Sequence, residues 1–229
     1  MFEDRKDAGE KLARALKRYK DRDVIVLAIP RGGVEVGYQV AKYLAASFSL
    51  LVTRKLPFPD NPEAGFGAIA EDGSTFIFKD AERWLPKETI VEIMKEQKQE
   101  IKRRIAMLRK GRPLPEIDGK MVVLVDDGIA MGSTMRAAIM LCKNKKAMKI
   151  IVAVPVSGED VAEEIGKMVD EIVVLEKPVF FRAVAQAYRN WYDVSDQEVI
   201  ELMKKRGDVK ESDEKKMPAV VDLEKCDGC

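Results

Sequence analysis

Two adjacent acids occupy a place in the sequence where they could bind a ligand. Asp126 and Asp127 follow a continuous apolar run at 121–125, MVVLV, and precede a loop that contains Gly128 and Gly132. An apolar run rich in β-branched residues is typical of a parallel strand that is buried on both faces. Because open α/β sheets bind ligands at the carboxyl ends of their strands, the two carboxylates are candidates for binding hydroxyl groups or a cation.

The loop after the acids has the composition of a phosphate site. Its glycines allow a tight turn and a close approach of the backbone to a ligand. Ser133 and Thr134 are the expected N-cap residues of a helix at Met135–Lys143, and the amides at a helix N-terminus bind anions. A phosphate beside carboxylates that bind hydroxyl groups indicates a ligand such as a ribose 5-phosphate. The alternative is a solvated Asp-Asp-Gly turn.

A second glycine turn follows an earlier strand. We expect a buried strand at Val24–Ile29, the turn PRGG at 30–33 and a helix at Val34–Ala46. A strand end, a glycine turn and a helix N-terminus again favour an anion, and Arg31 would pair with phosphate oxygens. The alternative is a glycine-rich β–α turn with a solvated arginine.

A third segment combines basic residues with a stretch rich in Pro and Gly. A short strand expected at Leu50–Thr53 ends in Arg54 and Lys55, and residues 56–73 follow as a predicted flexible loop. A loop of this length inside a compact domain is usually functional. It contains three acids that could act as a general base or could simply be solvated: Glu63, Glu71 and Asp72.

The elements that position these motifs alternate between strands and helices. Further strands are expected at Lys149–Val154 and Glu171–Leu175, and further helices at Arg5–Lys20, Glu159–Met168 and Asp196–Lys204. This order predicts one doubly wound α/β domain at 1–204, with a mainly parallel sheet flanked by helices. A long charged helix inserted at about 86–110 has apolar residues at helical spacing, which indicates a packing or dimer element.

The composition excludes several classes of function. The chain has 229 residues, a net charge of +1 and no histidine. Without histidine there can be no Ser-His or Cys-His nucleophile pair and no histidine-ligated metal. The balanced charge gives no general attraction to nucleic acid, and no apolar run reaches the length of a membrane span. The charged N-terminus has no apolar signal-peptide core, so we expect a cytoplasmic protein.

Residues 205–229 differ from the rest of the chain. They are at first almost wholly charged, which is typical of disorder, and they end in the pair Cys226 and Cys229. A tetrahedral zinc site or an iron–sulfur cluster needs four ligands, and only Cys142 remains elsewhere. The alternatives are a site shared across a dimer and a tail that is idle or redox-active.

The stretch 121–134 resembles the phosphoribosyl pyrophosphate (PRPP) binding signature of type I phosphoribosyltransferases. The order of the motifs over residues 1–200 is most similar to a group known as predicted phosphoribosyltransferases. The resemblance implies transfer of the 5-phosphoribosyl group of PRPP to a nitrogen nucleophile, expected to be a nucleobase, with release of pyrophosphate. The alternative is a PRPP-binding sensor or regulator without turnover.

The resemblance also implies a role for each motif. Asp126 and Asp127 would hold the ribose hydroxyls and, with Lys55, form the catalytic set. The 5-phosphate would be bound by Gly128, Ile129, Ala130, Met131, Gly132, Ser133 and Thr134. The pyrophosphate would be bound by Arg31, Gly32, Gly33, Arg54 and Lys55. Mg²⁺ would arrive mainly with PRPP, with the two acids as further candidate ligands.

The chain departs from the family pattern in the phosphate loop. Met131 stands where the family often has threonine, and Ala130 stands where hypoxanthine/guanine-type members carry an aspartate. The family places a base-recognising hood in variable segments. Phe180, Phe181 and Trp191 are therefore candidates for contacting the acceptor base, with core packing as the alternative for each. The family also leads us to expect a homodimer.

Overall fold

The centre of the molecule is a five-stranded parallel sheet with the strand order β2-β1-β6-β7-β8. The structure is a computed structural model that describes residues 1–205, apart from the side chain of Glu82. The strands of the sheet are β1 (Val24–Ala28), β2 (Ser47–Leu50), β6 (Met121–Val125), β7 (Lys149–Val156) and β8 (Glu171–Glu176). The predicted charged tail with its two cysteines lies almost wholly outside the described residues.

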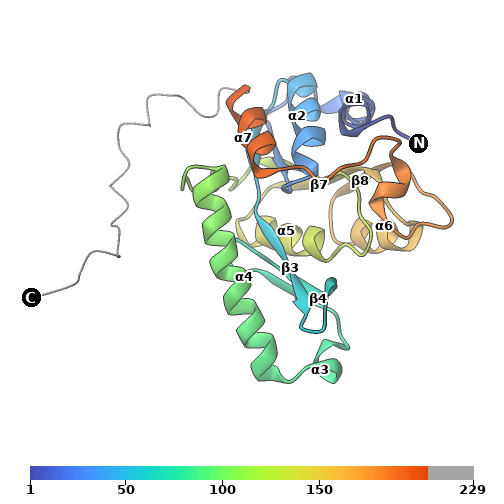
Figure 1. The fold of residues 1–229 in the computed structure, drawn as a ribbon. Coiled ribbons are helices and arrows are strands. Elements are labelled where there is room, and N and C mark those ends of the chain that lie inside the picture. The colour runs from blue at the N-terminus through green and yellow to red at the C-terminus, as the bar shows by residue number, and fades with distance from the viewer. Residues whose placement is uncertain (206–229) are drawn as a thin grey trace, which may run out of the picture.

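Helices cover both faces of this sheet (Figure 1). One face carries α1 (Arg5–Ala15), α2 (Gly33–Leu44) and α7 (Asp196–Lys205), and the other carries α5 (Ser133–Asn144) and α6 (Glu159–Gly166). Neighbouring side chains of a strand point to opposite faces. Val26 and Val123 therefore pack with the first group of helices, and Leu27 and Leu124 pack with the second. The predicted doubly wound α/β fold is confirmed.

A second, antiparallel sheet and the long helix form a separate layer. This sheet consists of β3 (Thr53–Phe58), β4 (Asn61–Ala70) and β5 (Thr75–Ile77), and α3 (Ala81–Trp84) precedes α4 (Lys87–Leu108). Figure 1 shows α4 alongside β3 and β4. Their common core contains Leu56, Phe66, Ile69, Ile90, Ile93 and Ile101. The predicted long inserted helix is confirmed. It packs against the antiparallel sheet and shares this hydrophobic core with it.

The segment 56–73, predicted as a flexible loop, is not a loop throughout, because most of its residues form the β3–β4 hairpin. Proline and glycine have other uses here. The pairing register shifts on both sides of Pro57, at the irregular end of the hairpin. A Cβ at Gly67 would lie 2.3 Å from the carbonyl oxygen of Phe76 in β5. Residues that commonly break strands therefore allow a bulge and a close approach of two backbones.

Two further element boundaries differ from the predictions. The strand predicted at Leu50–Thr53 is wrong, because Leu50 ends β2 and Thr53 begins β3. The first helix ends at Ala15, and the 3₁₀ helix η1 (Lys17–Tyr19) follows it. The segment after β8 contains one more short 3₁₀ helix, η2 (Val184–Ala187).

Among residues 1–205, no helix is both long enough and apolar enough to cross a membrane.

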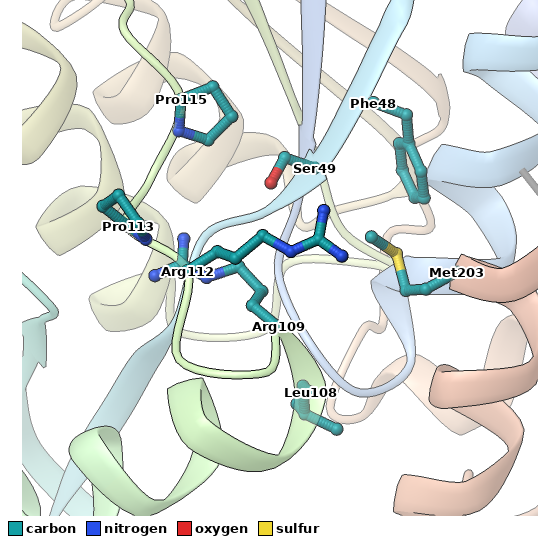
Figure 2. Close-up of a pocket in the computed structure, with 8 residues that line it drawn as sticks. All are labelled: Phe48, Ser49, Leu108, Arg109, Arg112, Pro113, Pro115 and Met203. Carbon is teal, nitrogen blue, oxygen red and sulfur yellow. The ribbon is translucent and has the colours of Figure 1, made fainter. Parts of the chain in front are cut away.

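A buried ion pair joins the end of α4 to both sheets. Arg109 donates to both carboxylate oxygens of Glu71, which follows β4, and to the Leu50 carbonyl oxygen at 3.0 Å. The Glu71 carboxylate also accepts a hydrogen bond from the Val52 amide at 3.0 Å. The two charged side chains are only 4% and 7% exposed. Figure 2 shows Arg109 beside Arg112 in a small cavity between the end of α4, β2 and Met203 of α7.

Replacing Glu71 with glutamine would leave the Arg109 guanidinium buried without a compensating charge. Removing one partner of a buried pair costs about 3–5 kcal/mol, so we expect the free energy of unfolding in urea to fall by about that amount. The exposed acid Glu63 gives the matched control, and Glu63→Gln should change the free energy by less than about 0.5 kcal/mol. Equal stability of the two variants would contradict the structural role of Glu71.

Candidate active site

The two acids lie at the carboxyl end of β6, next to the end of β1. Asp127 is buried, and its Oδ2 accepts a hydrogen bond from the Arg5 Nε of α1 at 2.8 Å. The hydroxyl of Tyr188 donates to the Asp127 carbonyl oxygen at 2.6 Å. The Asp127 amide donates to Oδ1 of Asp126 at 2.9 Å, so the first carboxylate is also held in place. Groups from two distant parts of the chain, together with the pair's own backbone, thus fix the geometry of the acids.

Burial and mutual repulsion govern the charge of the pair. Burial and the neighbouring Asp127 carboxylate raise the pKa of Asp126 well above the ordinary value for an aspartate. Burial also raises the pKa of Asp127, but the adjacent Arg5 guanidinium opposes this rise. The pair is therefore suited to bind a cation or hydroxyl donors. Asp127 already has a cationic partner in Arg5, whereas Asp126 has none of its own within residues 1–205.

The PRGG turn touches the acid pair directly. Parallel pairing of Ala28 with Val125 ends β1 and β6 at the same level, and the peptide bond that follows Pro30 is cis. A Cβ at Gly32 would lie 1.8 Å from Oδ2 of Asp127, and a Cβ at Gly33 would lie 2.8 Å from the Asp126 Cα. Both glycines are required because only a backbone without side chains fits against the acids.

The predicted phosphate loop lines a cavity of about 390 Å³. All of residues 128–134 contribute to its wall, together with Lys55, Glu63, Gly65, Arg182 and Val184. The hydroxyl residues Ser133 and Thr134 are half-buried here. Loop amides, two hydroxyl groups and two cationic side chains around one cavity are suited to an oxyanion.

The prediction that Ser133 and Thr134 precede α5 as its N-cap is wrong. Gly132 is the N-cap, with φ of 76°, and no side chain caps the helix. Ser133 and Thr134 instead occupy the first turn of α5. Because Gly132 adopts the left-handed conformation, the chain can turn into the helix there at little steric cost. No described side chain caps the amides of the first turn of α5, which begins at the cavity. These amides are therefore available to a ligand.

The three predicted pyrophosphate cations have different surroundings. Lys55 lines the cavity, and its Nζ donates to the Glu63 carbonyl oxygen at 2.5 Å. Arg54, the preceding residue of β3, points to the opposite face of the strand, and its Nε donates to Gln97 of α4 at 3.1 Å. Arg31 lies 3.8 Å from Asp196 at the start of α7. Burial and the nearby Arg104 guanidinium lower the pKa of Arg54, and the positive charge of Arg31 in the PRGG turn acts in the same direction.

The aromatic candidates do not form one platform. Phe180 is 89% exposed, whereas Phe181 is half-buried and lines a second cavity with Ala130 on the far side of the phosphate loop. The Trp191 ring lies against the Arg5 guanidinium, 3.9 Å from its centroid, and packs on Tyr188 at 5.3 Å. One face of Trp191 is therefore already covered by a protein side chain.

Sequence reasoning missed Arg5, Tyr188, Arg182 and Val184. Arg5 carried a detectable signal. It continues the apolar stripe of the first helix, three residues before Ala8, and a charged residue on an apolar face is expected to have a buried partner. Its partner Asp127 is 122 residues away, so the pairing itself could not be read from local spacing. Arg182 and Val184 lie in the segment after β8 and belong to no local sequence pattern.

The described residues do not form a dedicated metal cage. In residues 1–205, no group of three or more Cys, Asp or Glu side chains has the arrangement needed to hold a metal ion. The acid pair offers carboxylate oxygens, but Asp127 is already paired with Arg5. The donor set therefore fits a cation that arrives with its own oxygen ligands better than it fits a resident ion.

Comparison with known proteins agrees with this geometry. Residues 2–189 match the model of the phosphoribosyl transferase domain. Two Mycobacterium tuberculosis proteins, from strains CDC 1551 and H37Rv, are each named "Putative phosphoribosyl transferase" and are 40% identical over 205 residues, or 89% of this chain. The chain spans only 46% of the length of these relatives. The crystal structure of TT1426 from Thermus thermophilus is 33% identical, with a TM-score of 0.75 over 90% of this chain and 98% of that one.

A model match over residues 2–189 includes the whole parallel sheet, the acid pair and both glycine turns. The chain belongs to the type I phosphoribosyltransferase family.

The fit between Gly32 and Asp127 can be tested with a single methyl group. Gly32→Ala should displace the Asp127 carboxylate, because the added Cβ would overlap Oδ2. Forcing an atom into a filled site costs about 1–3 kcal/mol, which thermal unfolding would detect. Gly158 is the control, because a Cβ there would meet only Phe181 at 3.8 Å. If Gly32→Ala is no less stable than Gly158→Ala, the close contact is not present in solution.

Proposed function

We propose that this protein transfers the 5-phosphoribosyl group of PRPP to a nitrogen nucleophile of a nucleobase and releases pyrophosphate. The observation that supports this most directly is the contact between the PRGG turn and the acid pair. It brings a region suited to hydroxyl groups, Asp126 and Asp127, between two regions suited to phosphate groups. PRPP has the same sequence of groups: a 5-phosphate, a ribose diol and a pyrophosphate.

In the proposed complex, the phosphate loop and the first turn of α5 bind the 5-phosphate. Met131 cannot donate a side-chain hydrogen bond, so the hydroxyls of Ser133 and Thr134 and the loop amides carry this contact. Arg182 lines the same cavity and adds positive charge. The carboxylates of Asp126 and Asp127 accept hydrogen bonds from the 2- and 3-hydroxyls. This anchors the sugar ring at two ends and orients C1 toward the acceptor.

The reaction breaks the bond between C1 and the pyrophosphate oxygen, and that oxygen keeps the electron pair. A bond forms between C1 and the acceptor nitrogen, which loses its proton. Positive charge develops on the ribose in the transition state, and the carboxylates of the acid pair stabilise it. Lys55 and Arg31 neutralise the leaving pyrophosphate, and Arg54, whose side chain is bound to Gln97, adds positive charge nearby. Mg²⁺ would be part of the substrate and would reach the site bound to PRPP.

The candidate bases have unequal positions for removing the acceptor proton. Glu71 is committed to Arg109, and both carboxylate oxygens of Asp72 accept hydrogen bonds from Ser74. Glu63 is exposed and lines the cavity beside Lys55. Among these three acids, Glu63 is therefore the one we propose to be within reach of an acceptor. Val184 lines the same cavity as Glu63, whereas Phe181 lines the second cavity beside Ala130.

Pyrophosphate release from Mg–PRPP, measured with a panel of nucleobases, tests the proposal. Asp126→Asn with Asp127→Asn should lower turnover by at least about 10³-fold, because charge stabilisation and anchoring of the diol are lost together. The control is Asp21→Asn with Asp23→Asn, two exposed acids before β1. Full activity of the Asp126→Asn, Asp127→Asn double variant would contradict the assignment of the acid pair to the active site. PRPP binding in calorimetry without release with any base would favour the sensor function.

The acid pair also predicts a pH dependence. The two carboxylates must be ionised to hold the diol and the developing positive charge. Because both pKa values are raised, activity should fall with decreasing pH well before the pH reaches the ordinary aspartate pKa of about 3.9. Asp126→Asn removes the carboxyl whose pKa is raised more, so the loss of Mg–PRPP affinity on acidification should move to lower pH in this variant. A profile that is the same in Asp126→Asn would contradict the higher pKa of Asp126.

A further inference from the structure

Arg5 is the charged residue that contacts the acid pair most closely, although it lies at the start of the chain in α1. Its side chain is 6% exposed, and its Nε donates to Oδ2 of Asp127 at 2.8 Å. A second donor, Nη1, is bound to the carbonyl oxygen of Tyr192 at 2.9 Å. The flat face of the guanidinium lies on the Trp191 ring, 3.9 Å from its centroid. The buried guanidinium thus has three partners: a carboxylate that pairs with its charge, a carbonyl oxygen that accepts from its second donor, and an aromatic ring that stacks on its flat face.

These contacts leave Asp127 little freedom to move. Arg5 holds one carboxylate oxygen, and the Tyr188 hydroxyl holds the backbone carbonyl of the same residue. Gly32 closes the remaining side, because even one methyl group there would overlap Oδ2. The stack of Arg5 on Trp191 fixes the guanidinium in turn. A buried ion pair with its cation fixed in this manner sets the direction of the carboxylate and its ionisation.

We propose that Arg5 is the positioning residue of the acid pair: it orients the Asp127 carboxylate for the ribose diol and couples it to the segment 188–192. This rests on the proposed function. Arg5 would act through Asp127 rather than touch PRPP itself. Trp191 would consequently serve as a stacking platform for Arg5 rather than contact the acceptor base. A change in the charge or position of Asp127 would be transmitted through Arg5 to the indole.

Arg5→Met should lower kcat for pyrophosphate release by about 10²-fold, the loss expected for a misplaced catalytic group. An opposite charge beside a carboxyl lowers its pKa by about 1–3 units, so the acid limb of the pH profile should move up by at least about one unit. Arg5→Lys restores the charge but neither the flat stack nor the second fixed donor. It should return the acid limb to the wild-type position while kcat recovers only in part.

Lys6→Met is the matched control, since it removes an exposed cation from the neighbouring position of the same helix. It should leave kcat and the acid limb unchanged. If Arg5→Lys, folded by circular dichroism, has the wild-type kcat, or if its acid limb is as displaced as that of Arg5→Met, the positioning role is overturned. The same conclusion follows if Arg5→Met folds and behaves like Lys6→Met.

A second measurement needs no PRPP and separates this inference from the proposed function. The chain has two tryptophans, so Trp84→Phe leaves Trp191 as the single indole reporter. Its fluorescence should change as the Asp127 carboxyl is protonated, and Asp127→Asn should abolish that change. The other titratable groups that face this site are Asp126, Tyr188, Tyr192 and Glu198. Burial raises the pKa of Tyr188 and of Tyr192, and hydrogen bonds from Ser195 lower the pKa of Glu198, so none of these three titrates with the acid pair.

A fluorescence change that survives Asp127→Asn, or no change at all, would overturn the link between Asp127 and Trp191. Failure of the wild-type protein to bind or turn over PRPP would overturn the proposed function instead. In that case an Asp127-dependent fluorescence change would still support the link from Asp127 through Arg5 to Trp191.

Discussion

The parallel pairing of β1 with β6 is the constraint on which the site depends. Both strands are apolar and almost wholly buried, and their register sets Ala28 opposite Val125. The Ile29 amide continues the pairing by donating to the Val125 carbonyl oxygen at 2.9 Å. The two chains then leave the sheet at the same height and immediately turn. A slip of one residue would turn every side chain of a strand to the opposite face. The contact between the PRGG turn and the acids is therefore fixed by two hydrophobic cores that surround the sheet.

Charge is distributed unevenly around this edge. The negative groups are buried at the centre, where Arg5 compensates one of them. The cations lie toward the margin, and their contacts are weaker: Arg31 is 3.8 Å from Asp196, and Lys55 is bound to a neutral carbonyl group. Partners of this kind can be exchanged for phosphate oxygens at small cost, whereas the pair of Arg5 and Asp127 cannot be broken cheaply. The arrangement separates permanent contacts from contacts that are available to a charged ligand.

The sequence was sufficient for those features that depend on local patterns. Continuous apolar runs predicted all but one strand of the parallel sheet, and the spacing of Ile90, Ile93 and Ile101 predicted the long helix. The acid pair and the glycine turns were recognisable because strand ends and glycines leave a signature in a short stretch. The β3–β4 hairpin was missed because its prolines and glycines are also typical of loops. The pairing of Arg5 with Asp127 was missed because it depends on how distant elements meet, which no local pattern encodes.

One face of the antiparallel sheet packs against α4 in a hydrophobic core of its own, whereas Ala68 and Ala70 of β4 belong to a core of the parallel sheet. Parts of a domain that have a partly separate core often open at a lower free energy than the whole domain. Lys55 and Glu63 belong to the antiparallel sheet, whereas the acid pair and the phosphate loop belong to the parallel sheet. The cavity wall thus combines residues from two layers that differ in the free energy needed to open them. Amide hydrogen exchange in β3 and β4 would proceed through an opening that leaves Asp126, Asp127 and Arg5 in their folded arrangement.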